Sequence, residues 1–507
     1  MYENNYLANS LRSSSIGRED QYFAKLTDGV EITYEELFEQ SEKLAVVLTQ
    51  TGLEPGDRVI VQVEKSIEFV ELYIAVILAG GVFLPLNTAY TSEEIAYFVN
   101  DAEPSIFVCA PEKYDELKSI TSQSSVKKIY TLDGQHQGSL IDAIDIQKEN
   151  FFSVARNRDD NAAILYTSGT TGRSKGAMLT HNNLVSNAST LKEIWEFTAD
   201  DKLIHALPLF HVHGLFVAIN ITLLAGSSLL FHTGFNAQAI LEDMSHATVL
   251  MGVPTFYVRL LALDELNEQS TGSMRLFVSG SAPLLAETHT EWSIRTGHGI
   301  LERYGMTETN MNTSNPYASE RIAGTVGFPL PGVDVIVANS ETGEELSVGE
   351  IGSIEVKGPN VFAGYWNMPE KTAEEFRSNG FFITGDIGKF DSQGYLSIIG
   401  RSKDMIISGG FNVYPKEIES LIDNIEGVEE SAVIGLPHFD FGEGVAAVVI
   451  AKQGQQIDPE KIKFELTDKL AKFKQPKKVF ILDELPRNTM GKVQKVELRE
   501  TYKEAFQ

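Results

Sequence analysis

The stretch that decides the fold is residues 162–176, Ala-Ala-Ile-Leu-Tyr-Thr-Ser-Gly-Thr-Thr-Gly-Arg-Ser-Lys-Gly. An apolar run with strand composition passes here into a loop of hydroxyl residues, glycines and a lysine. Glycines let the backbone approach an anion closely, hydroxyl and N–H groups donate to phosphate oxygens, and a lysine supplies the counter-charge. A Walker A loop ends in Gly-Lys-Ser/Thr, whereas here Ser174 precedes Lys175, so that interpretation fails on spacing. The stretch therefore predicts a phosphate-binding loop, and a flexible surface loop is the alternative.

Further short apolar runs that end in Gly, Ser, Thr or Pro occur at residues 248–253 and 274–278. Upstream, Thr33-x-x-Glu36 and Thr91-x-x-Glu94 are typical of capping boxes that open helices, and residues 58–63 and 104–109 have strand composition. Strands that alternate with helices predict a doubly wound α/β fold, in which ligands collect at the carboxyl ends of the strands.

The composition changes twice along the chain. Short strands and Gly/Asp turns predict a β-rich subdomain over about 324–400, after α/β subdomains that extend to about 323. Expected helices at 415–425 and 459–472 and strands at 431–435, 445–450 and 478–482 then form a small α+β unit. We therefore expect an N-terminal domain over 1–400, a hinge at 401–404 and a small mobile C-terminal lid domain over 405–507.

The overall composition excludes several classes of protein. The 507 residues carry a net charge of −28, which disfavours binding to nucleic acid. No apolar run reaches the 20 or so residues that span a bilayer, so we expect no membrane span. A single cysteine, Cys109, cannot form an intramolecular disulfide, and we expect a cytoplasmic protein.

Further motifs resemble those of the adenylate-forming acyl-CoA synthetase family, which includes luciferases and adenylation domains. They follow the phosphate loop in the family's order and extend over nearly the whole chain. Within the family, residues 301–313 are most similar to the malonyl-CoA synthetases. The motifs are Leu207-Pro-Leu-Phe-His211, Gly280-Ser-Ala-Pro283, Tyr304-Gly-Met-Thr-Glu308, Ile383-Thr-Gly-Asp386, Gly400-Arg-Ser-Lys-Asp404, Gly409-Gly-Phe-Asn412 and Pro486-Arg-Asn-Thr-Met-Gly-Lys492.

The resemblance implies a two-step activation of a carboxylate. ATP and the acid give acyl-AMP and pyrophosphate, and CoA then displaces AMP to give a thioester. It implies that Lys492, Glu308 and Thr170 are catalytic and that Thr170 and Glu308 hold Mg2+. The implied ATP-binding residues are Thr167, Ser168, Gly169, Thr170, Thr171, Gly172, Lys175, Gly280, Ser281, Ala282, Tyr304, Gly305, Met306, Thr307, Asp386, Arg401 and Lys492.

The C-terminal motifs have roles that depend on domain movement. The resemblance implies that Lys492 bridges the attacking carboxylate and the α-phosphate, that Lys403 is the hinge, and that Gly409, Gly410 and Phe411 line a pantetheine tunnel. Taken without the family, Lys492 is one of many lysines in a basic domain and Lys403 is an ordinary loop lysine. Asp386 matches the family's ribose-binding aspartate, with a turn aspartate as the alternative.

Arg303 bears on the choice of acid. It stands beside the 304–308 segment, where a guanidinium would be costly to desolvate unless it met an anion, such as the second carboxylate of a small diacid. Alternatively, Arg303 turns away and pairs with Glu302 or Glu308. Other candidates for the pocket wall are His211, Ser279, Met251 and Pro254.

The sequence predicts a malonate–CoA ligase with the substrates malonate, ATP and CoA. Three alternatives are a ligase for another small, medium-chain or aryl acid, a stand-alone adenylation enzyme that loads a carrier protein, and a nucleotide-binding regulator without catalysis. The last predicts a damaged Lys492 or Glu308 position, and both residues are intact. A lysine acetyltransferase and a deacetylase that act on Lys492 are expected partners, because acetylation would remove the positive charge.

Overall fold

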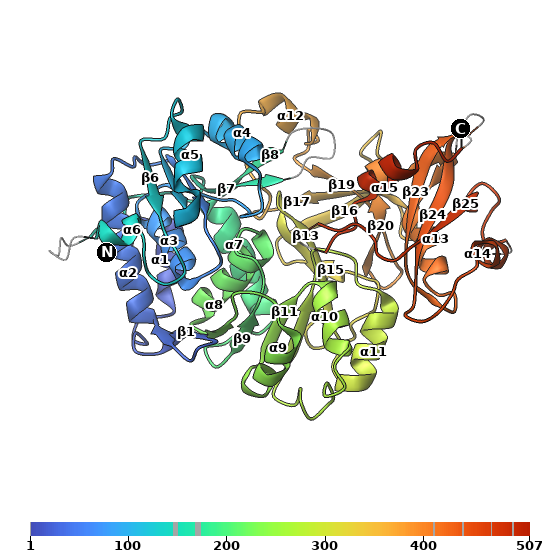
Figure 1. Ribbon diagram of the computed structural model, residues 1–507, viewed down its shortest axis with the longest axis horizontal. Coiled ribbons are helices and arrows are strands. Elements are labelled where there is room, and N and C mark those ends of the chain that lie inside the picture. The colour runs from blue at the N-terminus through green and yellow to red at the C-terminus, as the bar shows by residue number, and fades with distance from the viewer. Residues whose placement is uncertain are drawn as a thin grey trace. The chain divides into compact units, whose positions relative to one another are not determined.

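A computed structural model describes residues 2–144, 151–167, 174–408, 411–438, 441–467, 469–488 and 491–506. Contacts divide the chain into two compact units (Figure 1). The first contains Met1–Asp334 and Val356–Phe382, and the second contains Val335–Glu355 and Ile383–Gln507. Much of the expected β-rich subdomain is thus grouped with the C-terminal part, while the hinge at 401–404 stays a prediction.

The seven-stranded sheet of the first unit has the order β18-β8-β7-β4-β3-β5-β6. Its strands β7, β4, β3, β5 and β6 are parallel, whereas β8 runs antiparallel to both β7 and β18. The predicted phosphate loop therefore connects the two strands of an antiparallel hairpin. The strands are β3 (Arg58–Gln62), β4 (Val82–Pro85), β5 (Ile106–Cys109), β6 (Lys128–Thr131), β7 (Asn161–Thr167), β8 (Lys175–Thr180) and β18 (Gly364–Tyr365).

The nine-stranded sheet of the same unit has the order β15-β14-β13-β12-β11-β9-β10-β1-β2. Its six central strands are parallel, and antiparallel pairs close both edges. The strands are β1 (Tyr22–Leu26), β2 (Glu31–Thr33), β9 (Lys202–His205), β10 (Ser228–Phe231), β11 (Val249–Gly252), β12 (Leu276–Ser279), β13 (Leu301–Met306), β14 (Asn310–Ser314) and β15 (Phe328–Pro329).

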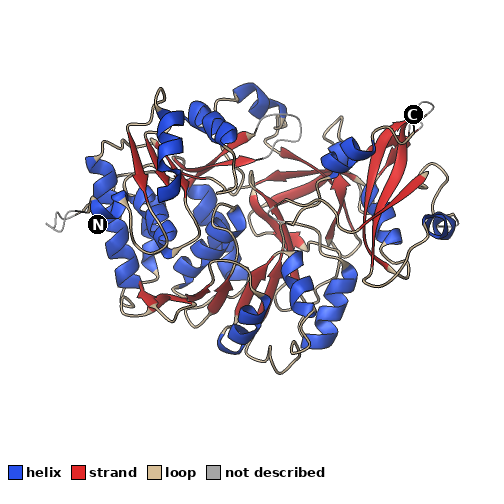
Figure 2. Ribbon diagram, in the orientation of Figure 1, coloured by secondary structure: helices blue, strands red, loops and turns tan. Residues whose placement is uncertain are grey.

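Helices accompany both sheets, as the colouring in Figure 2 shows. The α-helices are α1 (Tyr6–Ser13), α2 (Tyr34–Gln50), α3 (Ile67–Leu78), α4 (Ser92–Ala102), α5 (Tyr114–Thr121), α6 (Ser139–Asp142), α7 (His181–Ile194), α8 (Asn220–Ala225), α9 (Ala237–Asp243), α10 (Pro254–Leu261), α11 (Ala286–Thr296) and α12 (Pro369–Glu374). Short 3₁₀ turns lie at Pro111–Lys113 and Met244–His246, and His213–Ile219 forms a π-helix. The alternation of strands and helices confirms the predicted α/β class.

Local sequence explains where several of these helices begin. The capping boxes predicted at Thr33 and Thr91 are both present, and Ser66 caps α3. Helix α3 is buried along almost its whole length, with Tyr73 in contact with Phe83 of β4 and with Asn220 of α8. In the described part of the chain no helix is both long and apolar enough to cross a bilayer.

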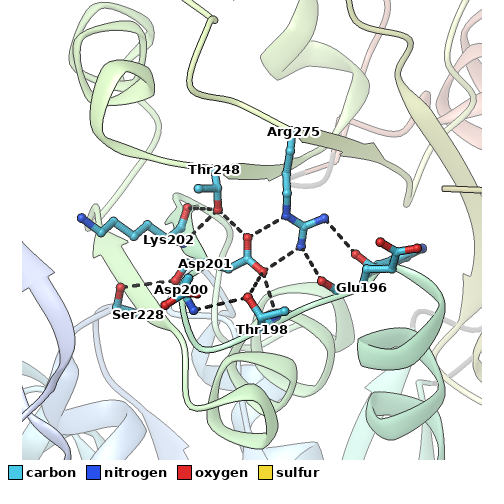
Figure 3. A network of polar contacts seen from close by, with 9 residues as sticks. Glu196, Thr198, Asp200, Asp201, Lys202, Ser228, Thr248 and Arg275 are labelled. Carbon is cyan, nitrogen blue, oxygen red and sulfur yellow. Dashed lines mark hydrogen bonds and ion pairs between the residues drawn. The ribbon is translucent and has the colours of Figure 1, made fainter. Parts of the chain in front are cut away.

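A polar network fixes the amino ends of three strands in the nine-stranded sheet (Figure 3). Asp201, just before β9, accepts hydrogen bonds from Arg275 Nε and Nη2 at 2.7 and 2.8 Å and from Thr248 Oγ1 at 2.7 Å. Thr248 precedes β11 and Arg275 precedes β12. The network holds these strands in register, and the register determines how their opposite ends, which carry the site, line up.

The second unit contains a four-stranded sheet of order β16-β17-β19-β20 and a five-stranded sheet of order β22-β21-β24-β23 with β25 paired to β24. The strands are β16 (Asp334–Ala338), β17 (Gly352–Lys357), β19 (Phe382–Phe390), β20 (Leu396–Arg401), β21 (Ile406–Ser408), β22 (Phe411–Val413), β23 (Val428–His438), β24 (Gly442–Ala451) and β25 (Lys478–Leu482). The helices are the 3₁₀ turn Ser402–Asp404, α13 (Pro415–Ile422), α14 (Pro459–Leu466) and α15 (Lys495–Tyr502).

Helix α14 is shorter than the sequence predicts. It ends at Leu466, although its pattern continued to Lys472. The side-chain amide of Gln475 donates to the carbonyls of Thr467 and Leu470 at 3.0 and 2.8 Å and so satisfies two backbone groups of the segment after the helix.

Candidate active site

The candidate acid pocket lies at the carboxyl ends of adjacent parallel strands in the nine-stranded sheet. Gly252 at the end of β11 is beside Ser279 at the end of β12, and Ser279 is beside Glu302 of β13. His211 and His213 come from the segment that follows β9, the other neighbour of β11. The order of the strands thus brings together candidates that are nearly a hundred residues apart in sequence.

Arg303 is the charged residue of this pocket. Only 4% of it is exposed, and its Nε and Nη2 atoms have no hydrogen-bond partner among the described residues. Burial lowers the pKa of Arg303 to about 9, which leaves the guanidinium charged at neutral pH. Glu302, proposed as an alternative partner, instead accepts from Gly324 N at 3.1 Å and faces His289 Nδ1 at 3.4 Å. A buried cation with free donors is a site for an anion.

Gly280 provides the space that this guanidinium occupies. A Cβ atom at Gly280 would lie 2.6 Å from both Nε and Nη1 of Arg303, well inside van der Waals contact. The glycine was predicted to border adenine. Its position also explains why a larger residue would displace Arg303.

Three further polar side chains lie at the same ends of the strands. Ser279 Oγ, His211 Nε2 and His213 Nε2 are buried and unpartnered within the described part of the chain. Burial lowers the pKa of His211 to about 4, and burial together with Arg303 lowers the pKa of His213 well below its ordinary value. His213 Nδ1 lies 3.4 Å from Ser281 Oγ. The imidazoles are therefore neutral at physiological pH, and the positive charge of the pocket resides on Arg303.

The other two candidates for the pocket wall lie at the same edge of the sheet. Met251 is fully buried in β11, and Pro254 is the first residue of α10, directly after that strand. Their part in binding the acid stays a prediction.

A bulge shapes the strand that carries Tyr304. The pairing of β13 with β14 shifts between Tyr304 and Gly305. A Cβ atom at Gly305 would come within 2.8 Å of the Asn310 carbonyl carbon, so the close approach of the two backbones requires glycine there. Met306 ends the strand, and Thr307 begins the turn that leads to Glu308.

Glu308 is the carboxylate proposed for Mg2+. It is 6% exposed, and its Oε1 lies 3.0 Å from the hydroxyl of Tyr365. Mg2+ is usually held by one or two carboxylates plus waters and substrate phosphates, and a single buried carboxylate fits that pattern. The described residues include no cluster of three His, Cys, Asp or Glu side chains that could hold a metal alone. Thr170, the second predicted metal residue, lies outside the described residues.

The described ends of the predicted phosphate loop are Thr167 and Lys175, which face each other across the β7–β8 hairpin. Ser168, Gly169, Thr170, Thr171 and Gly172 lie outside the described residues. Lys175 Nζ is 2.9 Å from Glu375 Oε1 and 4.0 Å from the ring centroid of Tyr365.

In the second unit, Asp386 and Arg401 face each other on β19 and β20. Asp386 Oδ1 lies 2.8 Å from Arg401 Nε, and Asp386 is 3% exposed. Thr384 Oγ1 accepts a hydrogen bond from Asp386 N at 3.1 Å, which fixes the backbone at this point. A buried carboxylate anchored in this way can accept from the two hydroxyls of a ribose.

Lys492 belongs to the same charged group as Asp386 and Arg401. Burial, followed by the charge of Arg401, lowers the pKa of Lys492 to about 8, while Asp386 partly opposes the shift. Its loop is fixed by Asn488, whose Oδ1 accepts from Lys492 N at 2.9 Å and whose N donates to Lys492 O at 3.0 Å. Gly491 has a φ of 73°, which favours glycine there.

The hinge and CoA candidates lie nearby in sequence. Lys403 is in a 3₁₀ turn whose last residue, Asp404, forms a 2.7 Å ion pair with Arg499. Phe411 is 56% exposed and stacks on Phe473 with a centroid distance of 4.6 Å. Gly409 and Gly410 lie outside the described residues.

Sequence reasoning missed three residues of the site. Tyr365 and Glu375 contact Glu308 and Lys175, respectively, but are far from them in sequence, and no spacing rule connects them. His213 was not among the candidates for the pocket wall, although it lies two residues from His211. The π-helix that begins at His213 is a form often found at functional sites, but no local sequence pattern predicts it.

Comparison with known proteins identifies the family. The profile of the AMP-binding enzymes matches residues 16–366, and that of the AMP-binding enzyme C-terminal domain matches residues 417–492. The crystal structure of ATP-bound MatB from Rhodopseudomonas palustris is 57% identical, covers 99% of this chain and 100% of its own, and superposes with a TM-score of 0.97.

Curated relatives are more distant. A malonate–CoA ligase of Arabidopsis thaliana is 36% identical over 88% of this chain and 78% of its own. A feruloyl-CoA synthase of an Amycolatopsis species is 35% identical over 94% of both chains. With a profile match over more than half of its length and relatives at this identity, the chain belongs to the adenylate-forming family of AMP-binding enzymes.

Proposed function

We propose that this protein is an AMP-forming acid–thiol ligase that converts malonate, CoA and ATP into malonyl-CoA, AMP and pyrophosphate through malonyl-AMP. The observation that carries the proposal is Arg303, a buried cation at the strand ends where the acid is expected, with two donors that have no partner among the described residues. A second carboxylate on a short acid would satisfy both donors bidentately. The likeness to a malonate–CoA ligase supports the same acid.

In the first step, a malonate oxygen attacks the α-phosphorus of ATP and pyrophosphate leaves. Lys492 meets the negative charge that builds between the carboxylate and the α-phosphate, and Asp386 and Arg401 hold the ribose. Bound Mg2+ would neutralise phosphate charge, with Glu308 and Thr170 as its protein ligands. The adenine and phosphate contacts come from the remaining ATP-binding candidates, Thr167, Ser168, Gly169, Thr171, Gly172, Lys175, Gly280, Ser281, Ala282, Tyr304, Gly305, Met306 and Thr307.

In the second step, the CoA thiol attacks the malonyl carbonyl and AMP leaves. The lid over residues 405–507 turns about Lys403, which removes Lys492 from the site and brings Phe411 with Gly409 and Gly410 to the pantetheine. Lys403 lies in the short 3₁₀ turn that follows β20, where a small change of backbone dihedrals would move the whole lid.

Regulation by acetylation is part of the proposal. A pKa of about 8 gives Lys492 a substantial neutral fraction, which is the form that attacks an acetyl donor. A lysine acetyltransferase would switch off the first step and a deacetylase would restore it. We place the enzyme in the cytoplasm, a reducing compartment that suits the free and buried Cys109.

An aryl acid ligase is the second candidate function, because the feruloyl-CoA synthase is similar over nearly the whole chain. The experiment that separates the two measures pyrophosphate release with malonate, butyrate, hexanoate, benzoate and ferulate. We expect malonate to give the highest kcat/KM, and a preference for any of the four monocarboxylates would refute the proposal. Repeating the malonate assay with CoA or with a phosphopantetheinylated carrier protein identifies the thiol acceptor, which we expect to be CoA.

A further inference from the structure

The segment that follows β18 is fixed against the strand that carries Lys175. Tyr365 pairs with Ala177 of β8, and Trp366 N donates to Gly176 O at 2.8 Å. Tyr365 N donates to Thr372 Oγ1 of α12 at 2.9 Å. Residues 364–375 thus form a short structural unit that is hydrogen-bonded at one end to the first residues of β8.

Side chains of this segment reach the predicted ATP-binding residue Lys175 and the predicted metal ligand Glu308. The Tyr365 hydroxyl lies 2.7 Å from Glu375 Oε2 and 3.0 Å from Glu308 Oε1. Glu375 Oε1 also accepts from Lys175 Nζ at 2.9 Å, and Lys371 Nζ is 3.2 Å away. The result is a chain of contacts from Lys175 through Glu375 and Tyr365 to Glu308.

In this arrangement the positive charge of Lys175 is paired with protein groups. Its ammonium meets the Glu375 carboxylate on one side and the face of the Tyr365 ring on the other, at 4.0 Å from the centroid. The Lys175 side chain is 17% exposed and that of Glu375 is 21% exposed, so water screens the pair less than an exposed one. The Glu375 carboxylate therefore fixes the position of the Lys175 ammonium and partly neutralises its charge.

We propose that Tyr365 and Glu375 are positioning residues for nucleotide activation: Glu375 holds Lys175 at the start of β8, and the Tyr365 hydroxyl orients Glu308. This inference rests on the proposed function for the role of ATP and deepens it. Lys175 then makes its contact with phosphate as half of an ion pair, at the position that Glu375 gives it. The tyrosine has one hydroxyl hydrogen for two carboxylates, so its orientation couples the Lys175 side of the site to Glu308.

A double-mutant cycle tests the ion pair. Lys175→Met, Glu375→Gln and the double variant are compared by equilibrium binding of ATP in EDTA, which requires neither acid nor turnover. We expect each single change to weaken ATP binding about tenfold, within the range for residues in contact. The double variant should bind ATP as tightly as the single variant with the lower affinity. Losses that multiply in the double variant would overturn the proposal, because Lys175 would then act without Glu375.

Lys371→Met is the matched control, since Lys371 also contacts Glu375 but lies on the exposed face of α12. ATP affinity should change less than twofold. A loss equal to that of Lys175→Met would contradict the special role of Lys175. Lys175→Gln is measured in parallel, so that the cycle remains interpretable if the methionine variant does not fold.

Tyr365→Phe tests the other half of the proposal, because it keeps the ring over Lys175 and removes only the hydroxyl. ATP affinity in EDTA should fall less than it does in Glu375→Gln, because the Lys175–Glu375 ion pair remains, whereas the gain in affinity on adding Mg2+ should fall about tenfold. An unchanged gain would refute the orientation of Glu308 by Tyr365. These binding measurements do not depend on which acid the enzyme activates, so their failure is distinguishable from a failure of the malonate proposal.

Discussion

Replacing Arg303 by leucine removes a buried charge whose Nε and Nη2 atoms have no hydrogen-bond partner in the described part of the structure. If the free carboxylate of malonate binds these atoms, the change leaves that carboxylate buried without a partner. Breaking such a pair costs roughly 2 to 5 kcal/mol, which corresponds to a loss of about 30-fold to several thousand-fold in kcat/KM for malonate. Butyrate has an uncharged methylene and methyl group in place of the free carboxylate, so its kcat/KM should fall far less or rise.

The stability of the Arg303→Leu variant, compared with that of Arg275→Leu, is the control for this prediction. Leucine removes an unpaired buried charge, so the melting temperature of Arg303→Leu should not fall. Arg275→Leu breaks the ion pair with Asp201 in the same sheet (Figure 3) and should lower the free energy of unfolding by roughly 3 kcal/mol. It should affect malonate and butyrate equally. The assay is pyrophosphate release with each acid, and an equal loss for both acids in Arg303→Leu would refute the diacid role.

The remaining predictions concern four positions. Gly280→Ala should reproduce the malonate-specific loss of Arg303→Leu in the same assay, because the added methyl group occupies the space of the guanidinium. Lys492 should lose its charge as the pH rises through about 8, so kcat/KM for ATP in malonyl-AMP formation should fall about tenfold per pH unit above that value. Thioester formation from supplied malonyl-AMP should not show this fall in rate. Lys492→Ala should abolish malonyl-AMP formation but still consume supplied malonyl-AMP with CoA, and Lys403→Pro should do the reverse; equal defects in the second step would contradict domain alternation. Burial raises the pKa of Glu71 from 4.5 to about 8, so the folded protein keeps a proton that the unfolded chain releases and stability should decline by about 1.4 kcal/mol per pH unit between these values. Denaturant titrations from pH 5 to 9 should show that Glu71→Gln removes this decline.

Local signals explain the parts of the fold that the sequence predicts well. The capping boxes at Thr33 and Thr91 depend on residues three positions apart, and both helices begin where expected. The end of α14 depends on the side chain of Gln475, nine residues beyond its last residue, and the predicted end was wrong. Contacts over longer separations leave no local pattern.

The same distinction holds for the site. Arg303 could be singled out because a guanidinium next to a nucleotide motif requires a partner. Its freedom from Glu302 and its contact with Gly280 depend on the pairing of β12 with β13. Tyr365 is 57 residues from Glu308, and only the packing of β18 on β8 brings its hydroxyl to that carboxylate. Sequence therefore identifies residues by chemical type, whereas tertiary structure selects their partners.

In the proposed function, Arg303 binds the second carboxylate of the substrate. The most direct measurement is a crystal structure of the enzyme with malonyl-AMP or with malonate and a non-hydrolysable ATP analogue. We expect the free carboxylate to accept hydrogen bonds from Nε and Nη2 of Arg303 at about 2.7 to 2.9 Å, with Ser279 or His211 nearby. A malonyl group whose free carboxylate points to solvent, with both Arg303 atoms bonded to protein or water, would contradict it.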